Sequence, residues 1–328
     1  MTIDARILAA LRGADGGSVS GAELSRELGI SRAAVWARIE ELRSLGYDIE
    51  ASPHLGYCLI SAPDLLHADD LYSRLGPTRV VGREIQVFET TTSTNDLVSR
   101  LAQNASKEGA VVFAESQTQG RGRLGRLWIS PARKGLWFSV LLRPNLTPQS
   151  ATQLTVAAAT ALVRAIDSQT GLAPEIKWPN DILIKGKKVA GILTELTAEL
   201  DHVKDVILGI GIDVNLEPHE FPPELRDCAT SLRIAVGEKV DRSALAVAVL
   251  RELDRIYHLV QSRQFESVAE EWQRRCNTLG RTVSIRMGDR VIRGRAESLD
   301  TDGALLIRGA YGRLERIIGG DVTMEKSD

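Results

Sequence analysis

Apolar residues in the first 60 positions recur every three or four residues, as they do on the buried face of an amphipathic helix. Residues 3–11 predict one helix, a second begins after Ser20, and a third runs from Arg32 to Leu45. Ser20 and Ser31 stand at N-cap positions, and Glu23 has capping-box spacing from Ser20. The pattern therefore predicts three short helices.

The second and third of these helices are joined by a tight turn at residues 29–31, which predicts a helix-turn-helix. Residues 47–60 follow as two extended runs that turn at 52–56, like the wing of a winged helix. In such a unit the second helix of the pair enters the major groove of DNA. The candidate DNA contacts at its start are Ser31, Arg32, Ala33, Trp36 and Arg38.

The middle of the chain alternates apolar runs with longer periodic segments, which predicts a mixed β-sheet with helices. Strands are expected near 87–88 and at 110–115, 136–142, 175–184, 189–195 and 206–215, with a hairpin turn at 185–188. Helices are expected after residue 94, from 147 to a glycine stop at 171, from a cap at Asp241 to about 260, and at 265–276. Pro179 interrupts one strand and places Asn180 and Asp181 at a bend.

The last fifty residues have a different pattern, with short apolar alternations separated by glycine turns. Strands are expected at 282–287, 291–299, 304–307 and 314–318, which is typical of a small β barrel. This part shows no obvious chemistry. The predicted domains are a winged helix at 1–62, a central domain at 63–277 and a barrel at 278–328, an α+β multidomain fold.

Composition places the chain among ordinary globular proteins, with 43% hydrophobic and 26% charged residues in 328. No apolar run approaches the length of a membrane span, and the first residues lack the features of a signal peptide, so a cytoplasmic protein without membrane contact is expected. The three cysteines and five histidines are scattered, which argues against a zinc site.

Charge weakens the DNA-binding interpretation of the first unit. Residues 1–60 hold six arginines and eight acidic residues, a formal balance of minus two. DNA binders are normally basic because phosphate neutralisation supplies much of their affinity. One copy should therefore bind DNA weakly, and a helical docking module stays an alternative.

Residues 120–126, which we call the Gly-Arg loop, read Gly-Arg-Gly-Arg-Leu-Gly-Arg. Glycine permits close approach to a ligand, and arginine offers donors matched to phosphate and carboxylate oxygens. No acidic residue lies between Glu115 and Asp167, so the local field favours an anion. A dinucleotide fingerprint fails because no helix follows, and neither kinase nor P-loop motifs occur. The alternative is a flexible basic surface loop.

Several further residues have either a structural or a ligand-binding interpretation. Ser93 and Asp96 have capping-box spacing at a helix start, so Ser93 could cap the helix or bind a small polar molecule. Trp128 and Trp137 could be core residues or stacking platforms, and core suits Trp137 better because it lies in an apolar strand. Lys188 could be solvated at a hairpin tip or take part in the site.

Three motifs together resemble those of the biotin protein ligases, in the long form whose N-terminal winged helix serves as biotin operon repressor. They are Ser93-Thr94-Asn95, the Gly-Arg loop, and Lys177-Trp178-Pro179-Asn180-Asp181 with Lys188 to Gly191. The resemblance covers essentially the whole chain and implies a class II synthetase-like biotin/lipoate ligase fold with a C-terminal SH3-like barrel. One departure is the wing, where Leu55 precedes Gly56 without the basic residue that the family often carries.

The resemblance implies a reaction of biotin with ATP and Mg²⁺ that gives biotinyl-5'-AMP, followed by transfer to a lysine of biotin carboxyl carrier protein. It implies catalytic roles for Lys188, Arg123 and Arg121. The implied biotin contacts are Ser93, Thr94, Asn95, Gln117, Gly120, Arg121, Gly122, Arg123, Lys188 and Gly191. The implied nucleotide contacts are Arg123, Arg126, Trp128, Lys177, Asn180, Asp181 and Asn215, with Asp181 also toward Mg²⁺.

For the N-terminal unit the resemblance implies operator binding as a homodimer that forms on ligand binding, with biotinyl-AMP as corepressor. A ligase with a vestigial or regulatory N-terminal module, and a DNA-binding sensor without chemistry, remain alternatives.

Overall fold

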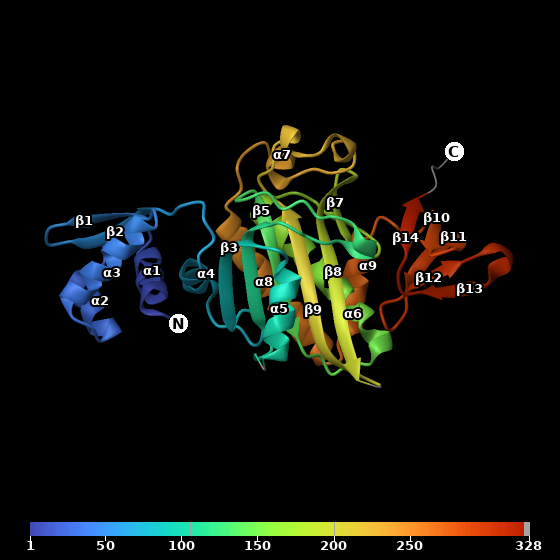
Figure 1. The fold of residues 1–328 in the computed structure, drawn as a ribbon, viewed down its shortest axis with the longest axis horizontal. Helices are drawn as coiled ribbons and strands as arrows, with labels where there is room; N and C mark the ends of the chain where they lie inside the picture. Colours follow the sequence, from blue (N-terminus) through green and yellow to red (C-terminus); the bar gives the residue numbers. More distant parts are fainter. Residues whose placement is uncertain (105, 200, 325–328) are drawn as a thin grey trace. The chain divides into compact units, whose positions relative to one another are not determined.

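A computed structural model describes residues 1–104, 106–199 and 201–324 (Figure 1). The chain divides into two compact units, Met1–Pro77 and Thr78–Asp328. The division into three domains at residues 62 and 277 stays a prediction. No helix in the described ranges is both long and apolar enough to span a bilayer.

The first unit is a helix-turn-helix with a small wing, as predicted. Its elements are α1 (Ile3–Gly13), α2 (Gly21–Leu28), α3 (Arg32–Ser44), β1 (Asp48–Ser52), β2 (Gly56–Ser61) and α4 (Ala68–Leu75). Ser20 and Ser31 accept the capping hydrogen bonds from Glu23 and Ala34, and Gly29 ends α2 with φ 69°. The apolar faces of α1 to α3 form one buried cluster that includes Ile7, Leu24 and Ile39. Helix α4 falls partly in a stretch where only a connection was expected.

The second unit is built on a mixed seven-stranded sheet of order β3-β4-β5-β9-β8-β7-β6. The strands are β3 (Glu84–Thr91), β4 (Ala110–Gln117), β5 (Gly135–Leu142), β6 (Glu175–Lys177), β7 (Asp181–Ile184), β8 (Lys187–Glu199) and β9 (His202–Asp213). Only the β3–β4 pair is parallel among these neighbours. Pro179 separates β6 from β7, so the predicted bend at Asn180 and Asp181 is confirmed.

Helices cover both faces of this sheet. They are α5 (Thr94–Gln103) on one face and α6 (Thr152–Thr170), α8 (Arg242–Gln261) and α9 (Phe265–Arg275) on the other, whereas the short α7 (Leu232–Val236) lies beyond the strand ends (Figure 1). Helix α5 packs against Leu141 of β5, whereas α6 and α8 pack against Val140 and Leu142, whose side chains point to the other face. The long helix α6 begins at Thr152, after a separate 3₁₀ turn that Pro148 opens, and it ends at Gly171 as expected.

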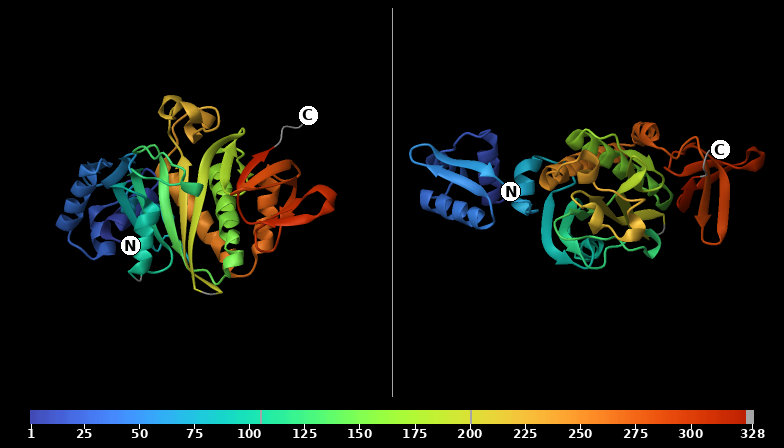
Figure 2. Two further views of the ribbon diagram at one scale, coloured as in Figure 1. Left: turned by 45° about the vertical axis from the view of Figure 1, so that its right-hand side comes forward. Right: turned by 90° about the horizontal axis from the view of Figure 1, so that it is seen from above.

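The C-terminal part of the second unit is an antiparallel five-stranded sheet, which we call the C-terminal sheet (Figure 2). Its strands are β10 (Thr282–Met287), β11 (Arg290–Leu299), β12 (Leu305–Arg308), β13 (Leu314–Ile317) and β14 (Asp321–Met324), in the order β13-β12-β11-β10-β14. Four of these strands lie where the glycine-punctuated pattern predicts them. Strand β14 was not predicted, because four residues after two glycines carry too little pattern.

A buried ion pair joins the sheet to α8. The guanidinium of Arg242 donates to Glu115 of β4, with an Nη1–Oε2 distance of 2.5 Å and an Nη2–Oε1 distance of 3.2 Å, and each side chain is 1% exposed. Arg242 Nη1 also donates to the carbonyl of Gly135 at 3.2 Å. Removing one member of such a pair leaves a buried, unpaired charge.

Glu115→Ala should therefore lower the free energy of unfolding of the second unit by about 3–5 kcal/mol in urea denaturation. Glu89→Ala is the matched control, because Glu89 pairs with Arg133 on the surface at 3.2 Å, and its loss should stay within about 1 kcal/mol. Equal losses of unfolding free energy in the two variants would contradict the prediction that the buried pair stabilises the second unit more than the surface pair does.

Candidate functional site

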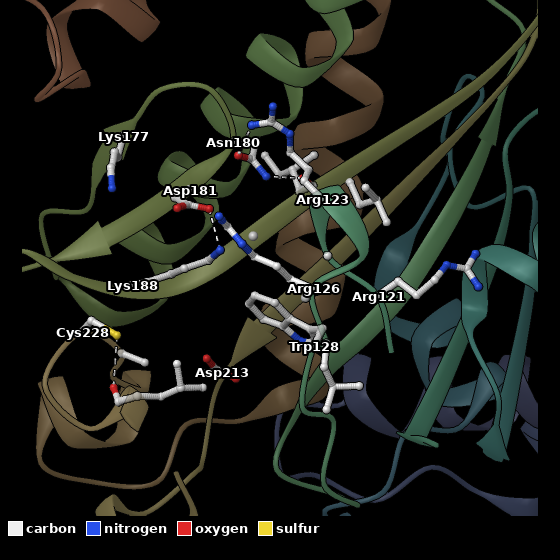
Figure 3. Close-up of a pocket in the computed structure, with 18 of the residues that line it drawn as sticks. Arg121, Arg123, Arg126, Trp128, Lys177, Asn180, Asp181, Lys188, Asp213 and Cys228 are labelled. Carbon is white, nitrogen blue, oxygen red and sulfur yellow. Dashed lines mark hydrogen bonds and ion pairs between the residues drawn. The ribbon is translucent and has the colours of Figure 1, made fainter. Parts of the chain in front are cut away.

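A cavity of about 710 Å³ opens in the second unit, lined by residues of the central sheet, the Gly-Arg loop and the C-terminal sheet. Figure 3 shows part of its lining. The cavity brings together residues that are far apart in the sequence. The predicted residues that line it are Ser93, Thr94, Asn95, Gln117, Arg121, Gly122, Arg123, Arg126, Trp128, Lys177, Asn180, Asp181, Lys188 and Gly191. The three motifs therefore form one site.

Glycines in adjacent strands make room for this cavity. Gly191 of β8 pairs with Gly211 of β9, and the Trp128 indole lies against both. A Cβ atom at Gly211 would stand 2.5 Å from the indole, and one at Gly209 would stand 2.3 Å from Asn95 Oδ1. Any side chain at Gly209 or Gly211 would collide with a residue that lines the cavity. Gly209 and Gly211 were not singled out from the sequence, because their role depends on which strands are neighbours.

One end of the cavity is a network of mostly neutral polar side chains, in which Asn95 Nδ2 also donates to the Glu195 carboxylate at 2.9 Å. The Thr94 N–H donates to Gln117 Oε1 at 2.9 Å, and Gln117 Nε2 donates to Ser130 Oγ at 2.9 Å. The Ser139 hydroxyl donates to Asn95 Oδ1 at 2.5 Å. Ser93 is buried at the N-cap position of α5 and makes no side-chain capping bond, so capping does not account for it. The network suits a small neutral ligand with its own donors and acceptors.

The Gly-Arg loop folds back on itself at a sharp turn. Leu124 and Gly125 have φ of 56° and 72°, and the Gly122 N–H donates to the Arg126 carbonyl at 2.7 Å. At the base of the loop, the Trp128 N–H donates to the carbonyl of Gly120 at 2.8 Å. This folding presents arginine side chains to the cavity from a short segment.

Each arginine of the loop meets a different environment. Arg121 donates to Asp96 at 2.8 Å, and that hydrogen bond raises the pKa of Arg121. Arg126 forms an ion pair with Asp321 of β14. Arg123 Nη1 donates to Asn180 Oδ1 at 3.1 Å, and burial lowers the pKa of Arg123 although Asp181 and Asp321 oppose that change. A buried guanidinium whose bond here is to an amide oxygen is suited to contact an anion.

Lys188 lines the cavity rather than projecting from the hairpin tip, and its side chain is 33% exposed. Its Nζ is 2.6 Å from Asp181 Oδ1 and 5.1 Å from the centre of the Trp128 ring. Its backbone N–H donates to the carbonyl of Cys228 at 2.8 Å, which fixes the start of β8 against the loop that follows β9. The ammonium is therefore positioned by a carboxylate, an aromatic face and its own strand.

Asp213, at the end of β9, is a cavity residue that sequence reasoning missed. Its side chain is buried and faces the cavity (Figure 3), and burial raises its pKa while the charge of Lys188 opposes the shift. A single acid after an apolar strand gives no signal in the sequence. The segment 216–229 and the C-terminal sheet also line the cavity and were not expected there.

Two predicted ligand residues do not line the cavity. The Asn215 amide is bonded to the backbone of Val240, donating at 2.9 Å and accepting at 3.0 Å. Gly120 lies at the base of the loop, where a Cβ would stand 2.4 Å from the Trp128 carbonyl oxygen. Their ligand contacts stay predictions, and the structure gives both residues a supporting role.

The predicted DNA contacts lie in the first unit. Arg32, Ala33 and Trp36 are exposed on α3, with 57% of Trp36 accessible. Ser31 caps this helix through its hydroxyl. Arg38 pairs with a carboxylate of its own unit, because its Nε and Nη2 donate to Asp4 of α1 at 2.7 and 2.6 Å. Arg32 is therefore the most accessible cation at the start of α3.

The chain matches three family models: an HTH domain over residues 5–58, the biotin/lipoate A/B protein ligase family over 87–213, and the biotin protein ligase C-terminal domain over 278–324. It is 40% identical to the bifunctional ligase/repressor BirA of Bacillus subtilis over 93% of this chain and 94% of the relative. It is 30% identical to the protein of that name from Escherichia coli, over 100% and 98%.

Among solved structures, the biotin protein ligase from Aquifex aeolicus in complex with biotin and ATP matches with a TM-score of 0.64 at 30% identity, over 75% of this chain and all of that chain. With identity at this level across nearly the full length, the chain belongs to the biotin protein ligase family, in the branch of the bifunctional ligase/repressors.

Proposed function

We propose that this protein activates biotin with ATP to biotinyl-5'-AMP and transfers the biotin to a lysine of biotin carboxyl carrier protein. The observation that carries the proposal is the cavity, which joins a neutral polar network to a cluster of cations. The network around Thr94 and Gln117 suits the ureido ring of biotin. The cations suit its carboxylate together with the phosphates of ATP.

The chemistry explains the need for so many cations. A carboxylate that attacks an α-phosphate brings two repelling anions together, so fixed positive charge stabilises the transition state more than the separated substrates. Lys188, Arg121 and Arg123 have this role in the proposal, and Lys188 acts as an electrostatic stabiliser. Burial of Arg123 strengthens its interaction with an anion.

Nucleotide binding is assigned to the other side of the cation cluster. Trp128 offers an aromatic face for adenine, and Arg126, Lys177 and Asn180 line the cavity beside it. Mg²⁺ would take Asp181 as its carboxylate ligand, with substrate phosphates supplying further oxygens. Asp181 fits this role because its side chain faces the cavity, where it pairs with Lys188.

The function is tested by incubating the purified full-length chain with biotin, ATP, Mg²⁺ and a biotin carboxyl carrier domain. The carrier should gain the mass of one biotin at its acceptor lysine, and omitting ATP should prevent this. A carrier that stays unmodified while known biotin ligases modify it would contradict the proposal.

Lys188→Ala tests the assigned role of the ammonium group. We expect adenylate formation in a single turnover to fall by about 10²–10³-fold, while biotin binding measured by calorimetry weakens by less than about 10-fold, because the charge matters most in the transition state. Lys187→Ala is the matched control, since Lys187 donates to the Arg226 carbonyl at 3.0 Å and does not line the cavity. Equal losses in binding and in rate would count against the role.

We further propose that the first unit binds operator DNA in the cytoplasm as part of a homodimer, with biotinyl-AMP as the effector. The exposed start of α3 supports this reading, and the acidic balance of the unit requires two copies on one duplex for useful affinity. The alternative is a ligase whose first unit is vestigial or only regulates assembly.

Arg32→Ala separates these alternatives. In gel-shift titrations with DNA upstream of biotin genes, in the presence of biotin and ATP, the variant should bind about 10-fold more weakly and keep full ligation activity. Arg26→Ala is the matched control: it removes the same charge from an exposed position of α2 and should weaken DNA binding less than Arg32→Ala does. If the parent protein binds no such DNA at low salt, or binds it equally without the ligands, the regulatory alternative is correct.

A further inference from the structure

The C-terminal sheet supplies one wall of the cavity, although its sequence shows no chemistry. Eight of its residues or those at its strand ends line the cavity, namely Ser284, Arg286, Val291, Gly320, Asp321, Val322, Thr323 and Met324. Five of these belong to β14 or directly precede it. The wall therefore depends on where β14 is held.

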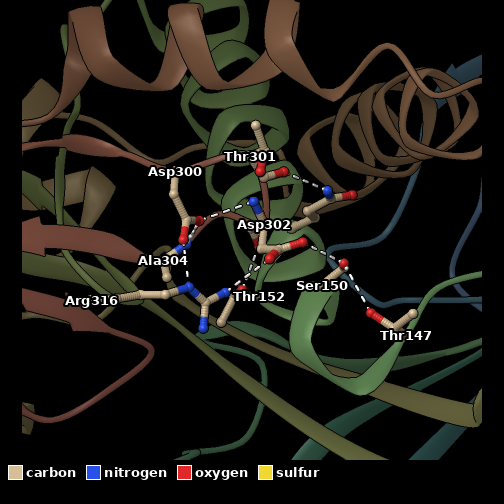
Figure 4. Close-up of polar contacts among 9 residues, drawn as sticks. Thr147, Ser150, Thr152, Asp300, Thr301, Asp302, Ala304 and Arg316 are labelled. Carbon is tan, nitrogen blue, oxygen red and sulfur yellow. Dashed lines mark hydrogen bonds and ion pairs between the residues drawn. The ribbon is translucent and has the colours of Figure 1, made fainter. Parts of the chain in front are cut away.

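A polar junction outside the cavity fixes the C-terminal sheet to the N-terminal end of α6 (Figure 4). Ser150 donates to Asp302 Oδ1 at 2.6 Å, and Thr152 donates to the Asp302 carbonyl at 2.6 Å. Within the junction, Asp300 accepts from the N–H groups of Asp302 and Ala304, both at 2.9 Å. None of these residues lines the cavity, so the sheet has an anchor that is independent of the ligand.

From this anchored sheet, two contacts reach the Gly-Arg loop. The Asp321 carboxylate forms an ion pair with Arg126, and the Gly320 carbonyl lies 3.5 Å from Arg123 Nη1. A Cβ at Gly319 would stand 3.2 Å from Arg123 Nη2, so the chain approaches the loop closely here. The side chains of Arg126 and Asp321 are 66% and 35% exposed, which marks the pair as weak and open to exchange.

The Asp321 carboxylate lines the cavity and pairs with an arginine of the loop, so it occupies a position that a ligand anion could also take. We propose that Asp321 is a positioning residue that holds Arg126, and with it the Gly-Arg loop, when no ligand is present, and that an oligophosphate displaces it from Arg126. The inference rests on the proposed function for the identity of that anion. It gives the C-terminal sheet a direct part in positioning the Gly-Arg loop.

Two consequences follow for Asp321→Asn. Without the carboxylate the empty loop is less restrained, so trypsin should cleave after Arg121, Arg123 or Arg126 about three-fold faster than in the parent chain. The same change removes a competitor for Arg126, so inorganic pyrophosphate should bind about three-fold more tightly. Asp321→Glu keeps the charge and should restore both parent values.

The experiment uses the full-length chain, with cleavage sites and rates read by mass spectrometry and pyrophosphate affinity by calorimetry. Asp289→Asn is the matched control, because it removes the same charge from the same sheet. Asp289 lies exposed in the β10–β11 turn. Parent-like loop cleavage in Asp321→Asn, or parent-like pyrophosphate affinity, would overturn the inference. Failure of the proposed function would appear separately, as absent biotin transfer by the parent chain.

Discussion

Electrostatic balance inside one partly desolvated cavity is the constraint on which the site depends. Arginines and lysine converge there, and a cation removed from water needs a partner. The partners are the chain's own carboxylates: Asp96 for Arg121, Asp181 for Lys188 and, at the more exposed edge of the cavity, Asp321 for Arg126. Arg123 is the buried exception, bonded to an amide oxygen. In our proposal, an anionic substrate takes the place of Asp321 beside Arg126.

The fold brings these charged residues, which come from separate segments of the chain, to the same cavity. Glycines at adjacent positions of β8 and β9 leave space above the sheet, and Trp128 closes part of that space from the side of the loop. The turn between β6 and β7 delivers Asn180 and Asp181, and the hairpin that follows delivers Lys188 opposite Asp181. The C-terminal sheet completes the wall from a position fixed at α6.

Many helix ends, and the meeting of the three motifs, could be predicted from short stretches of the sequence. Caps at Ser20, Ser31 and Asp241 and the glycine stop at 171 are local signals, and each marks a helix end in the structure. The motifs predicted that distant segments share a site, and the cavity confirms that they meet. What escaped prediction depends on tertiary neighbours: the pairing of β14 with β10, the glycines under Trp128, and the burial of Asp213. Ser93 was ambiguous for the same reason, because only the structure shows that it makes no capping bond with its side chain.

Biotin-dependent exchange of labelled pyrophosphate into ATP measures the reversal of adenylate formation, the step in which the cation cluster brings two anions together. We expect the full-length chain with Mg²⁺ to exchange label rapidly when biotin is present, and the exchange to fall to background when biotin is omitted. Exchange at the same rate without biotin, or none with biotin present, would contradict the proposed reaction.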